Sequence, residues 1–273
     1  MPASDPVEGR EFDAVLALGQ RLAAHLQQFI VPLFRLDDEG EATQFGSGFL
    51  VKSDGGYYLV SAAHVLDEVS ECRVGFPIGG RTFRVLHPSN YRSTPLPESG
   101  RRQDDRVDIG VLRLSGTLLP PYREAGKDAM PLEWLSPSPL TTANHFLLIG
   151  FPESKSKVDR MKGIQISGYW PVAAGAVSRE KFDRLKLNPD VHLALTWQKR
   201  HFLGRGKKRV SPISPVGMSG SPVFLPFGEA DADLDAGVIV AGILIEKRNR
   251  DSILVATKAI IAAEMILRLS GNS

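Results

Sequence analysis

The stretch Gly217-Met218-Ser219-Gly220-Ser221-Pro222 is the strongest indication of fold and chemistry in this chain. It places one serine close to two glycines, directly before the apolar run Val223-Phe224-Leu225. Far upstream, Ser61-Ala62-Ala63-His64 ends an apolar segment with a histidine, and Asp108 opens the apolar run Ile109-Gly110-Val111. Each of these local contexts suits one residue of a catalytic triad, here in the chain order His, Asp, Ser.

Each of the three residues suits one task in acyl transfer. A serine hydroxyl needs a base to take its proton as it attacks, and His64 is the natural candidate because imidazole as a side-chain type ordinarily titrates near physiological pH. A buried aspartate fixes the tautomer of the imidazole and compensates its charge after protonation. We expect Asp108 in this role because it begins a strand that can hold it rigidly. The alternatives Asp104 and Asp105 lie in the polar run 101–106, which we interpret as a solvated loop.

The glycines around Ser219 predict a binding site for the oxyanion that acyl transfer develops. Backbone N–H groups that converge on such an oxygen contribute several kcal/mol of stabilisation. Gly217 lacks a Cβ, so its backbone can adopt conformations closed to other residues and turn its N–H inward. We expect the N–H groups of Gly217 and Ser219 to form the oxyanion hole. Ser47 in Gly46-Ser47-Gly48 is an alternative nucleophile, but no oxyanion-type motif surrounds it. We interpret Gly46-Ser47-Gly48 as a place where two strands approach closely.

The chain resembles the trypsin-like (chymotrypsin-fold, PA-clan) serine endopeptidases, in the style of bacterial HtrA-type protease domains without a PDZ domain. The matching stretches are 46–51, 58–64, 107–114, 148–152 and the Ser219 motif, over roughly residues 28–260. The order His, Asp, Ser agrees with this family, whereas α/β-hydrolases run Ser, acid, His and subtilisins run Asp, His, Ser. The resemblance implies a serine endopeptidase that acts through His64, Asp108 and Ser219 by way of an acyl-enzyme.

The resemblance also implies an all-β fold of two six-stranded antiparallel Greek-key β-barrels with an N-terminal and a C-terminal helix. We expect a helical extension over 1–27, a first barrel over 28–118, a proline-rich linker over 119–140 and a second barrel with the C-terminal helix over 141–273. Apolar residues at three- and four-residue steps predict helices over about 9–27 and 258–269. Many short strands separated by turns argue against a parallel α/β sheet.

The expected strands follow from short apolar runs between turn residues. They cover 29–36, 48–52, 57–61, 73–76, 82–86 and 109–114 in the first barrel, and 145–149, 163–170, 191–196, 222–225, 238–245 and 252–257 in the second.

The resemblance gives an expectation for specificity and activation. The floor of the family's specificity pocket falls on Ile213, and one wall falls on Ile245 and Glu246. Because an unpaired cation is costly to bury, Ile213 predicts small or medium apolar residues before the cut. A preference for Lys or Arg stays open if the Glu246 carboxylate reaches the pocket. Met218 replaces the aspartate of zymogen-activated members, so activation by clipping is not expected.

Composition limits the other classes of function. The chain has 33 Lys and Arg against 31 Asp and Glu, a net charge of +2, so general affinity for nucleic acid or anionic membranes is not expected. The basic run 199–209 is interpreted as a solvated loop, with an acidic partner, nucleic acid or the edge of the substrate cleft as alternatives. The histidines lack metal-ligand spacing, and Cys72 is the only cysteine, so we expect no metal and no cofactor.

The same features suggest a compartment and partners. A single cysteine forms no intrachain disulfide, and the first residues lack a basic segment followed by an apolar core, which together favour a reducing, cytoplasmic location. We expect a protein or peptide substrate, a regulatory protein partner as an option, and no membrane. The alternative function is a trypsin-fold interaction module without turnover. The retained His64, Asp108, Ser219 and Gly217 favour the enzyme.

Overall fold

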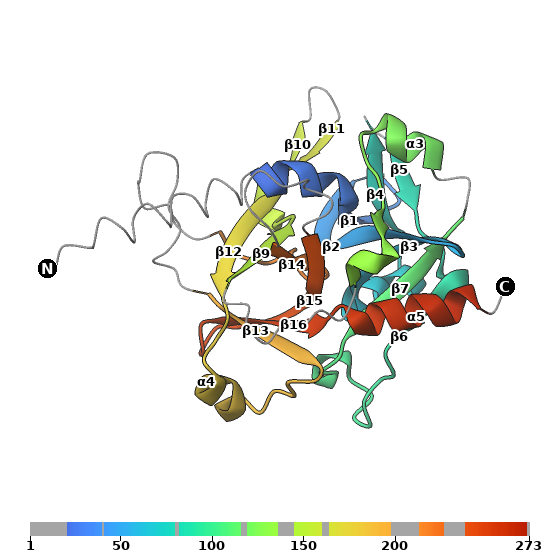
Figure 1. The fold of residues 1–273 in the computed structure, drawn as a ribbon. Coiled ribbons are helices and arrows are strands. Elements are labelled where there is room, and N and C mark those ends of the chain that lie inside the picture. The colour runs from blue at the N-terminus through green and yellow to red at the C-terminus, as the bar shows by residue number, and fades with distance from the viewer. Residues whose placement is uncertain are drawn as a thin grey trace, which may run out of the picture.

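Two mostly antiparallel sheets make up the body of the molecule (Figure 1). The computed structural model describes residues 21–39, 41–79, 82–115, 119–135, 145–159, 164–197, 213–226 and 238–271. Short helices lie between and beside the sheets, and the chain ends on a longer helix beside the first sheet (Figure 1).

The first sheet has eight strands where six were expected. They are β1 (Ile30–Leu36), β2 (Ala42–Ser53), β3 (Gly56–Ala62), β4 (Val74–Gly79), β5 (Thr82–Val85), β6 (Tyr91–Ser93), β7 (Ile109–Leu114) and β8 (Met130–Pro131). Their order is β5-β4-β1-β2-β3-β7-β6, and β8 pairs with β2 in parallel. The additional strands β6 and β8 are three and two residues long, too short to show a period of two in the sequence.

The second sheet has six strands, as expected. They are β9 (His145–Gly150), β12 (Trp170–Gly175), β13 (His192–Thr196), β14 (Pro222–Pro226), β15 (Val238–Arg248) and β16 (Ile253–Lys258), in the order β12-β9-β14-β15-β16-β13. An isolated bridge between Ala176 and Leu195 brings the two edges of this sheet together. The single strand expected over 163–170 is wrong, because β11 (Ile164–Ser167) pairs with β10 (Ser156–Asp159) and β12 begins separately at Trp170.

Short helices and 3₁₀ turns lie between the strands, and the last helix connects the two sheets. The helices are residues 21–26, α2 (Ala63–Leu66), α3 (Leu119–Glu124), α4 (Arg179–Arg184) and α5 (Ile260–Ser270), with 3₁₀ turns η1 (Gln27–Phe29), η2 (Asp67–Ser70), η3 (Pro88–Asn90), η4 (Arg102–Asp104), η6 (Leu132–Leu135) and η8 (Glu153–Lys155). α5, red in Figure 1, leaves β16 and packs on β3 and β7 of the first sheet, with Ile266 fully buried. Every helix among the described residues is too short or too polar to span a bilayer.

The segment expected as a linker contains regular structure in its described part. It holds α3, β8 and η6, and Met130 and Leu135 are fully buried in the main core. Pro120 and Pro121 lie in the first turn of α3, where a missing N–H breaks no helical hydrogen bond. Proline content alone therefore overstated the irregularity of this segment. The expected N-terminal helix is described only from residue 21, where the chain is helical to residue 26.

Candidate active site

His64 and Asp108 form a hydrogen-bonded pair where β3 and β7 lie side by side. α2 begins directly after β3, and Ala62 at the end of β3 pairs with Ile109 at the start of β7, so the strand register brings the two residues together. Nδ1 of His64 lies 2.6 Å from Oδ2 of Asp108, and the backbone N–H of His64 donates to Oδ1 at 2.9 Å. Because a carboxylate only accepts, Nδ1 carries the proton and Nε2 is the basic nitrogen of the neutral ring.

Asp108 holds this position in a strained backbone conformation. Its φ is 49°, in the left-handed region, which costs a residue with a Cβ about 1 kcal/mol although aspartate tolerates it better than most. The carbonyl of Asp108 accepts from the N–H of Ala63 at 2.9 Å, and the next N–H, of Ile109, donates to Oγ1 of Thr94 at 3.1 Å. The side chain of Asp108 is 6% exposed and that of His64 is 39% exposed, so the imidazole alone faces solvent.

The two residues before Asp108 are anchored to the second sheet. The carbonyl of Arg106 accepts from Nε2 of His192 at 2.8 Å, and the carbonyl of Val107 accepts from Oγ1 of Thr257 at 2.6 Å. His192 and Thr257 are buried and lie opposite each other on β13 and β16. Nδ1 of His192 accepts a backbone N–H at 3.0 Å, which leaves Nε2 as the donor. One cross-strand pair of the second sheet therefore binds two successive carbonyls of the loop that leads into β7.

Arg102 joins the turn after α2 to the loop before β7. Its side chain is 13% exposed and donates from Nε to Asp67 at 2.7 Å and from Nη1 to Asp105 at 2.8 Å. The Asp105 carboxylate also accepts from the hydroxyl of Thr94 at 2.8 Å and from the N–H of Val107 at 2.9 Å. Burial acts to raise the pKa of Asp105, but these hydrogen bonds outweigh it and hold the pKa below its usual range.

The interpretation of 101–106 as a solvated loop is wrong for two of its six side chains, those of Arg102 and Asp105. Arg101 and Asp104 pair with each other on the surface, with side chains 68% and 39% exposed. Arg102 and Asp105 are instead 13% and 6% exposed. Residues three apart share a face of a 3₁₀ turn, so η4 turns one Arg–Asp pair outward and the adjacent pair inward. A run of polar residues in the sequence does not show which Arg–Asp pair is buried.

Every backbone carbonyl of the turn 216–219 accepts a hydrogen bond. The donors are the N–H of Glu153 to Val216 at 2.9 Å, Oγ of Ser47 to Gly217 at 2.8 Å, the N–H of Ser221 to Met218 at 3.0 Å and the N–H of Ser47 to Ser219 at 2.9 Å. These donors come from both sheets or the loops beside them, so the turn is held at the junction between the sheets.

The bound carbonyls determine where the N–H groups of the turn point. The C=O and N–H of a trans peptide point in opposite directions, so the held carbonyls of Val216 and Met218 direct the N–H groups of Gly217 and Ser219 away from those donors. Within the described residues neither of these two N–H groups donates a hydrogen bond. Two unpartnered N–H groups beside a serine hydroxyl provide what a developing oxyanion needs.

Two positions of the turn require glycine. Gly217 and Gly220 both have φ of 86°. A Cβ at Gly217 would lie 2.7 Å from the backbone N of Glu153, and a Cβ at Gly220 would overlap the hydroxyl of Ser61. The contact of Gly220 with β3 sets the turn beside the strand that leads into α2.

Ser219 is half-buried on this turn, close in the fold to the segment that carries His64. Among the described residues, the Ser219 hydroxyl and the His64 ring form no hydrogen bond. Such bonds are often long before substrate binds. The contact between the two side chains therefore stays a prediction.

The residues expected around the specificity pocket lie on two different segments. Ile213 is half-buried in the loop before the turn, and Ile245 is buried at a bulge of β15. The side chain of Glu246 is 48% exposed, and its Oε2 accepts from Nε of Arg248 at 2.9 Å. The carboxylate of Glu246 is thus already paired with a cation of its own strand. The basic run 199–209 lies outside the described residues.

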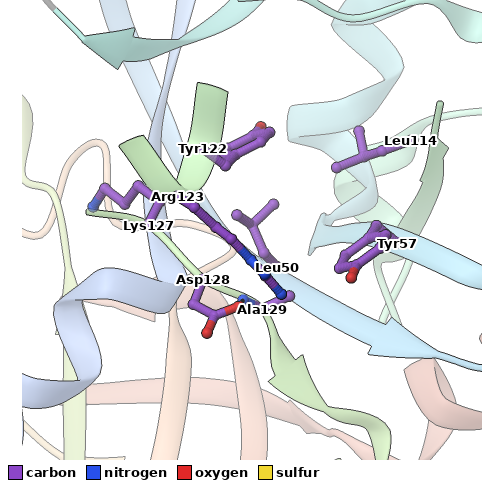
Figure 2. Close-up of a pocket in the computed structure, with 8 residues that line it drawn as sticks. All are labelled: Leu50, Tyr57, Leu114, Tyr122, Arg123, Lys127, Asp128 and Ala129. Atoms are coloured by element: carbon purple, nitrogen blue, oxygen red, sulfur yellow. Dashed lines mark hydrogen bonds between the residues drawn. The ribbon is translucent and has the colours of Figure 1, made fainter. Parts of the chain in front are cut away.

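A small pocket lies between α3 and the strands β2, β3 and β7 (Figure 2). It is lined by Leu50, Tyr57, Leu114, Tyr122, Arg123, Lys127, Asp128 and Ala129. Nζ of Lys127 donates to the carbonyls of Gln27 and Ile30, at 2.9 Å each. Burial lowers the pKa of this amine to about 8. None of the lining residues belongs to the candidate site, so the pocket is a feature of the first sheet.

Sequence reasoning missed the supporting role of Ser47. The close approach expected at Gly46-Ser47-Gly48 is observed for the glycines, since a Cβ at Gly48 would lie 2.9 Å from the side chain of Leu59. The hydroxyl between them instead binds Gly217, 170 positions further along the chain. The sequence shows the pattern of two glycines around a serine, but it does not show that the serine hydroxyl binds Gly217.

Known proteins share this architecture. A family model described as a trypsin-like peptidase domain matches residues 46–230. Neuropsin, a serine protease expressed in the limbic system of mouse brain, is 14% identical with a TM-score of 0.54, over 89% of this chain and 95% of that chain. The VesB protease of Vibrio cholerae is 16% identical with a TM-score of 0.52, over 88% of this chain and 63% of that chain. At these identities the two structures show a shared fold. No curated protein sequence matches the chain.

Proposed function

The chain belongs to the family of trypsin-like peptidase domains, and we propose that it is a serine endopeptidase with a His64–Asp108–Ser219 triad. The observation that carries the proposal is the 2.6 Å hydrogen bond from Nδ1 of His64 to Asp108, which leaves Nε2 as a base. The N–H groups of Gly217 and Ser219, which donate to no group among the described residues, support it. The two sheets would correspond to the two barrels of such an enzyme.

In the proposed reaction, Oγ of Ser219 attacks the carbonyl carbon of the scissile peptide bond while Nε2 of His64 takes its proton. The Asp108 carboxylate stabilises the imidazolium that forms. The N–H groups of Gly217 and Ser219 bind the oxyanion of the tetrahedral intermediate. The imidazolium then gives its proton to the leaving amine, and an acyl-enzyme remains on Ser219. Water, activated by the same imidazole, attacks the ester and releases the acid.

A fluorophosphonate probe tests this proposal directly. We expect the wild-type protein to be labelled on the peptide that contains Ser219, and we expect Ser219→Ala and His64→Ala to lose labelling while they stay folded. Ser221→Ala is the matched control, because this hydroxyl is two positions away and fully buried. Absence of labelling in a folded wild-type protein would favour the alternative, an interaction module without turnover.

The finer features belong to the same proposal. A peptidase implies protein or peptide substrates, and Ile213 supports small or medium apolar residues before the scissile bond. The stretches 46–51 and 58–64 support an HtrA-type protease domain. The single cysteine supports a reducing, cytoplasmic location. Met218 argues against activation by clipping, and control by a protein partner is the option we propose in its place. Cell fractionation and affinity purification with Ser219→Ala test the location and the partner.

A further inference from the structure

Ser47 contacts the Ser219 turn through both its backbone and its side chain. It lies in β2 of the first sheet and is fully buried. Its N–H donates to the carbonyl of Ser219 at 2.9 Å, and its hydroxyl donates to the carbonyl of Gly217 at 2.8 Å. The hydroxyl also accepts from the N–H of Phe151 at 3.0 Å. The only proton of the Ser47 hydroxyl is therefore donated to the Gly217 carbonyl, and the hydroxyl oxygen has no contact with solvent.

The contact with Phe151 extends this clamp to the segment that holds the start of the turn. Phe151 follows β9 and lies two residues before Glu153, whose N–H binds the carbonyl of Val216 at 2.9 Å. The buried side-chain amide of Gln44 donates to the carbonyl of Phe151. β2 therefore binds Phe151 on both its N–H and its carbonyl side, and the Ser47 hydroxyl ties that segment to the turn.

The hydroxyl is needed because the turn has a flexible centre. Gly217 has no Cβ, so the peptide groups on either side of it rotate with little steric resistance. The Gly217 carbonyl belongs to the peptide unit that follows Gly217, whereas the Gly217 N–H belongs to the unit before it, whose Val216 carbonyl accepts from the N–H of Glu153. The Ser47 hydroxyl acts on both units, because it donates to the Gly217 carbonyl and accepts from the N–H of Phe151, two residues before the Glu153 N–H that binds the Val216 carbonyl. Without the hydroxyl, the buried Gly217 carbonyl and the Phe151 N–H both lose a partner, and the Glu153 N–H that fixes the Gly217 peptide unit loses support.

We infer that Ser47 is a positioning residue for the oxyanion hole: its hydroxyl joins the Gly217 carbonyl to the segment from Phe151 to Glu153, which holds the Val216 carbonyl so that the Gly217 N–H faces the reacting oxygen. This inference rests on the proposed function and concerns the same site. Ser47 itself touches neither the substrate nor the reacting atoms.

The test is Ser47→Ala in the full chain, which removes the hydroxyl and keeps the backbone N–H bound to Ser219. Loss of one oxyanion donor lowers kcat by about 10²- to 10³-fold, and an indirect support is expected to lower it by about 10- to 100-fold. We expect KM for a peptide substrate to change little, because the oxyanion exists only in the transition state. The inhibition constant of a peptide aldehyde, which forms a tetrahedral adduct with Ser219, should rise by the same factor as kcat falls.

Two further variants separate positioning from stability. Ser47→Cys keeps the shape of the side chain with a slightly larger atom and weakens the donor, so a folded variant should show the same pattern of lower kcat with unchanged KM. Tyr58→Phe removes another buried hydroxyl bond, to Ser270 at 2.8 Å, far from the turn in sequence, and should leave kcat unchanged.

The inference is overturned if folded Ser47→Ala and Ser47→Cys keep the wild-type kcat and aldehyde affinity, if KM rises while kcat is unchanged, or if Tyr58→Phe causes equal losses. A folded wild-type protein that neither binds fluorophosphonate nor cleaves peptides would overturn the proposed function and this inference with it. An active wild type with unaffected Ser47 variants would overturn the inference alone.

Discussion

Replacing Arg102 by alanine tests whether a buried ion-pair network holds the His64–Asp108 pair in place. Arg102 links Asp67, which follows α2, to Asp105, which lies three residues before Asp108. The substitution removes the cation but leaves the Asp105 carboxylate, 6% exposed, inside the protein. The effect is therefore that of a buried charge left without its partner.

The expected magnitude follows from burial. Removing one partner of a buried ion pair costs about 3 to 5 kcal/mol of unfolding free energy. The Thr94 hydroxyl and the Val107 N–H stay bound to Asp105, and Asp67 is 31% exposed and open to water, so we expect the lower end, about 3 kcal/mol. For a chain of this length that corresponds to a fall in Tm of about 6 to 12 °C.

The neighbouring arginine provides the matched control. Arg101 pairs with Asp104 at the same spacing of three residues, but its side chain is 68% exposed. Exposed ion pairs contribute little, so we expect Arg101→Ala to leave stability nearly unchanged. Urea unfolding of the two variants at neutral pH makes the comparison. Arg102→Ala should also lower kcat, because the loop that carries Asp108 loses its link to α2.

The pH dependence has a definite sign. The pKa of Asp105 is lowered in the folded protein, so its contribution to stability is present above the pKa of an unfolded aspartate, about 3.9, and is lost as the pH falls through the folded value. The difference in unfolding free energy between wild type and Arg102→Ala should therefore decrease at acid pH. Equal destabilisation by the two arginine substitutions, or a difference that persists unchanged well below the folded pKa, would refute this reasoning.

Three further changes have expected outcomes. Asp108→Asn should lower kcat about 10⁴-fold near neutral pH, since an amide no longer holds the Nδ1–H tautomer of His64, and steady-state kinetics with a thermal melt as folding control measures this. Burial lowers the pKa of Lys127 to about 8, so between about pH 8 and about pH 10.4 the unfolded chain binds more protons than the folded protein. The free energy of unfolding should therefore rise with pH across this window. Urea titrations should show the rise in the wild type and not in Lys127→Met. Glu246→Gln should leave an apolar cleavage preference unchanged in a peptide library, because Arg248 already pairs with the carboxylate, and dominant cleavage after Lys or Arg that Glu246→Gln abolishes would contradict this.

Local sequence was sufficient for features that depend on neighbours along the chain. Short apolar runs between turn residues predicted the strands on which His64 and Asp108 depend, and the structure places Asp108, not Asp104 or Asp105, at 2.6 Å from His64. Because glycine has no Cβ, Gly217 was expected to adopt a backbone conformation that is closed to other residues, and its φ of 86° agrees with that expectation. Backbone propensity and apolar patterns depend on a few neighbouring residues, so they can be recognised in the sequence before the fold is known.

Only the tertiary structure decided which polar residues support the site. Ser47 and the His192–Thr257 pair look ordinary in sequence, and each binds backbone carbonyls of a segment far away along the chain. Arg101 and Arg102 are identical neighbours, yet one pairs on the surface and the other inside. A hydrogen bond or an ion pair acts over about 3 Å in space, and the distance in space between residues 170 positions apart is set by how the two sheets pack, which no local pattern contains.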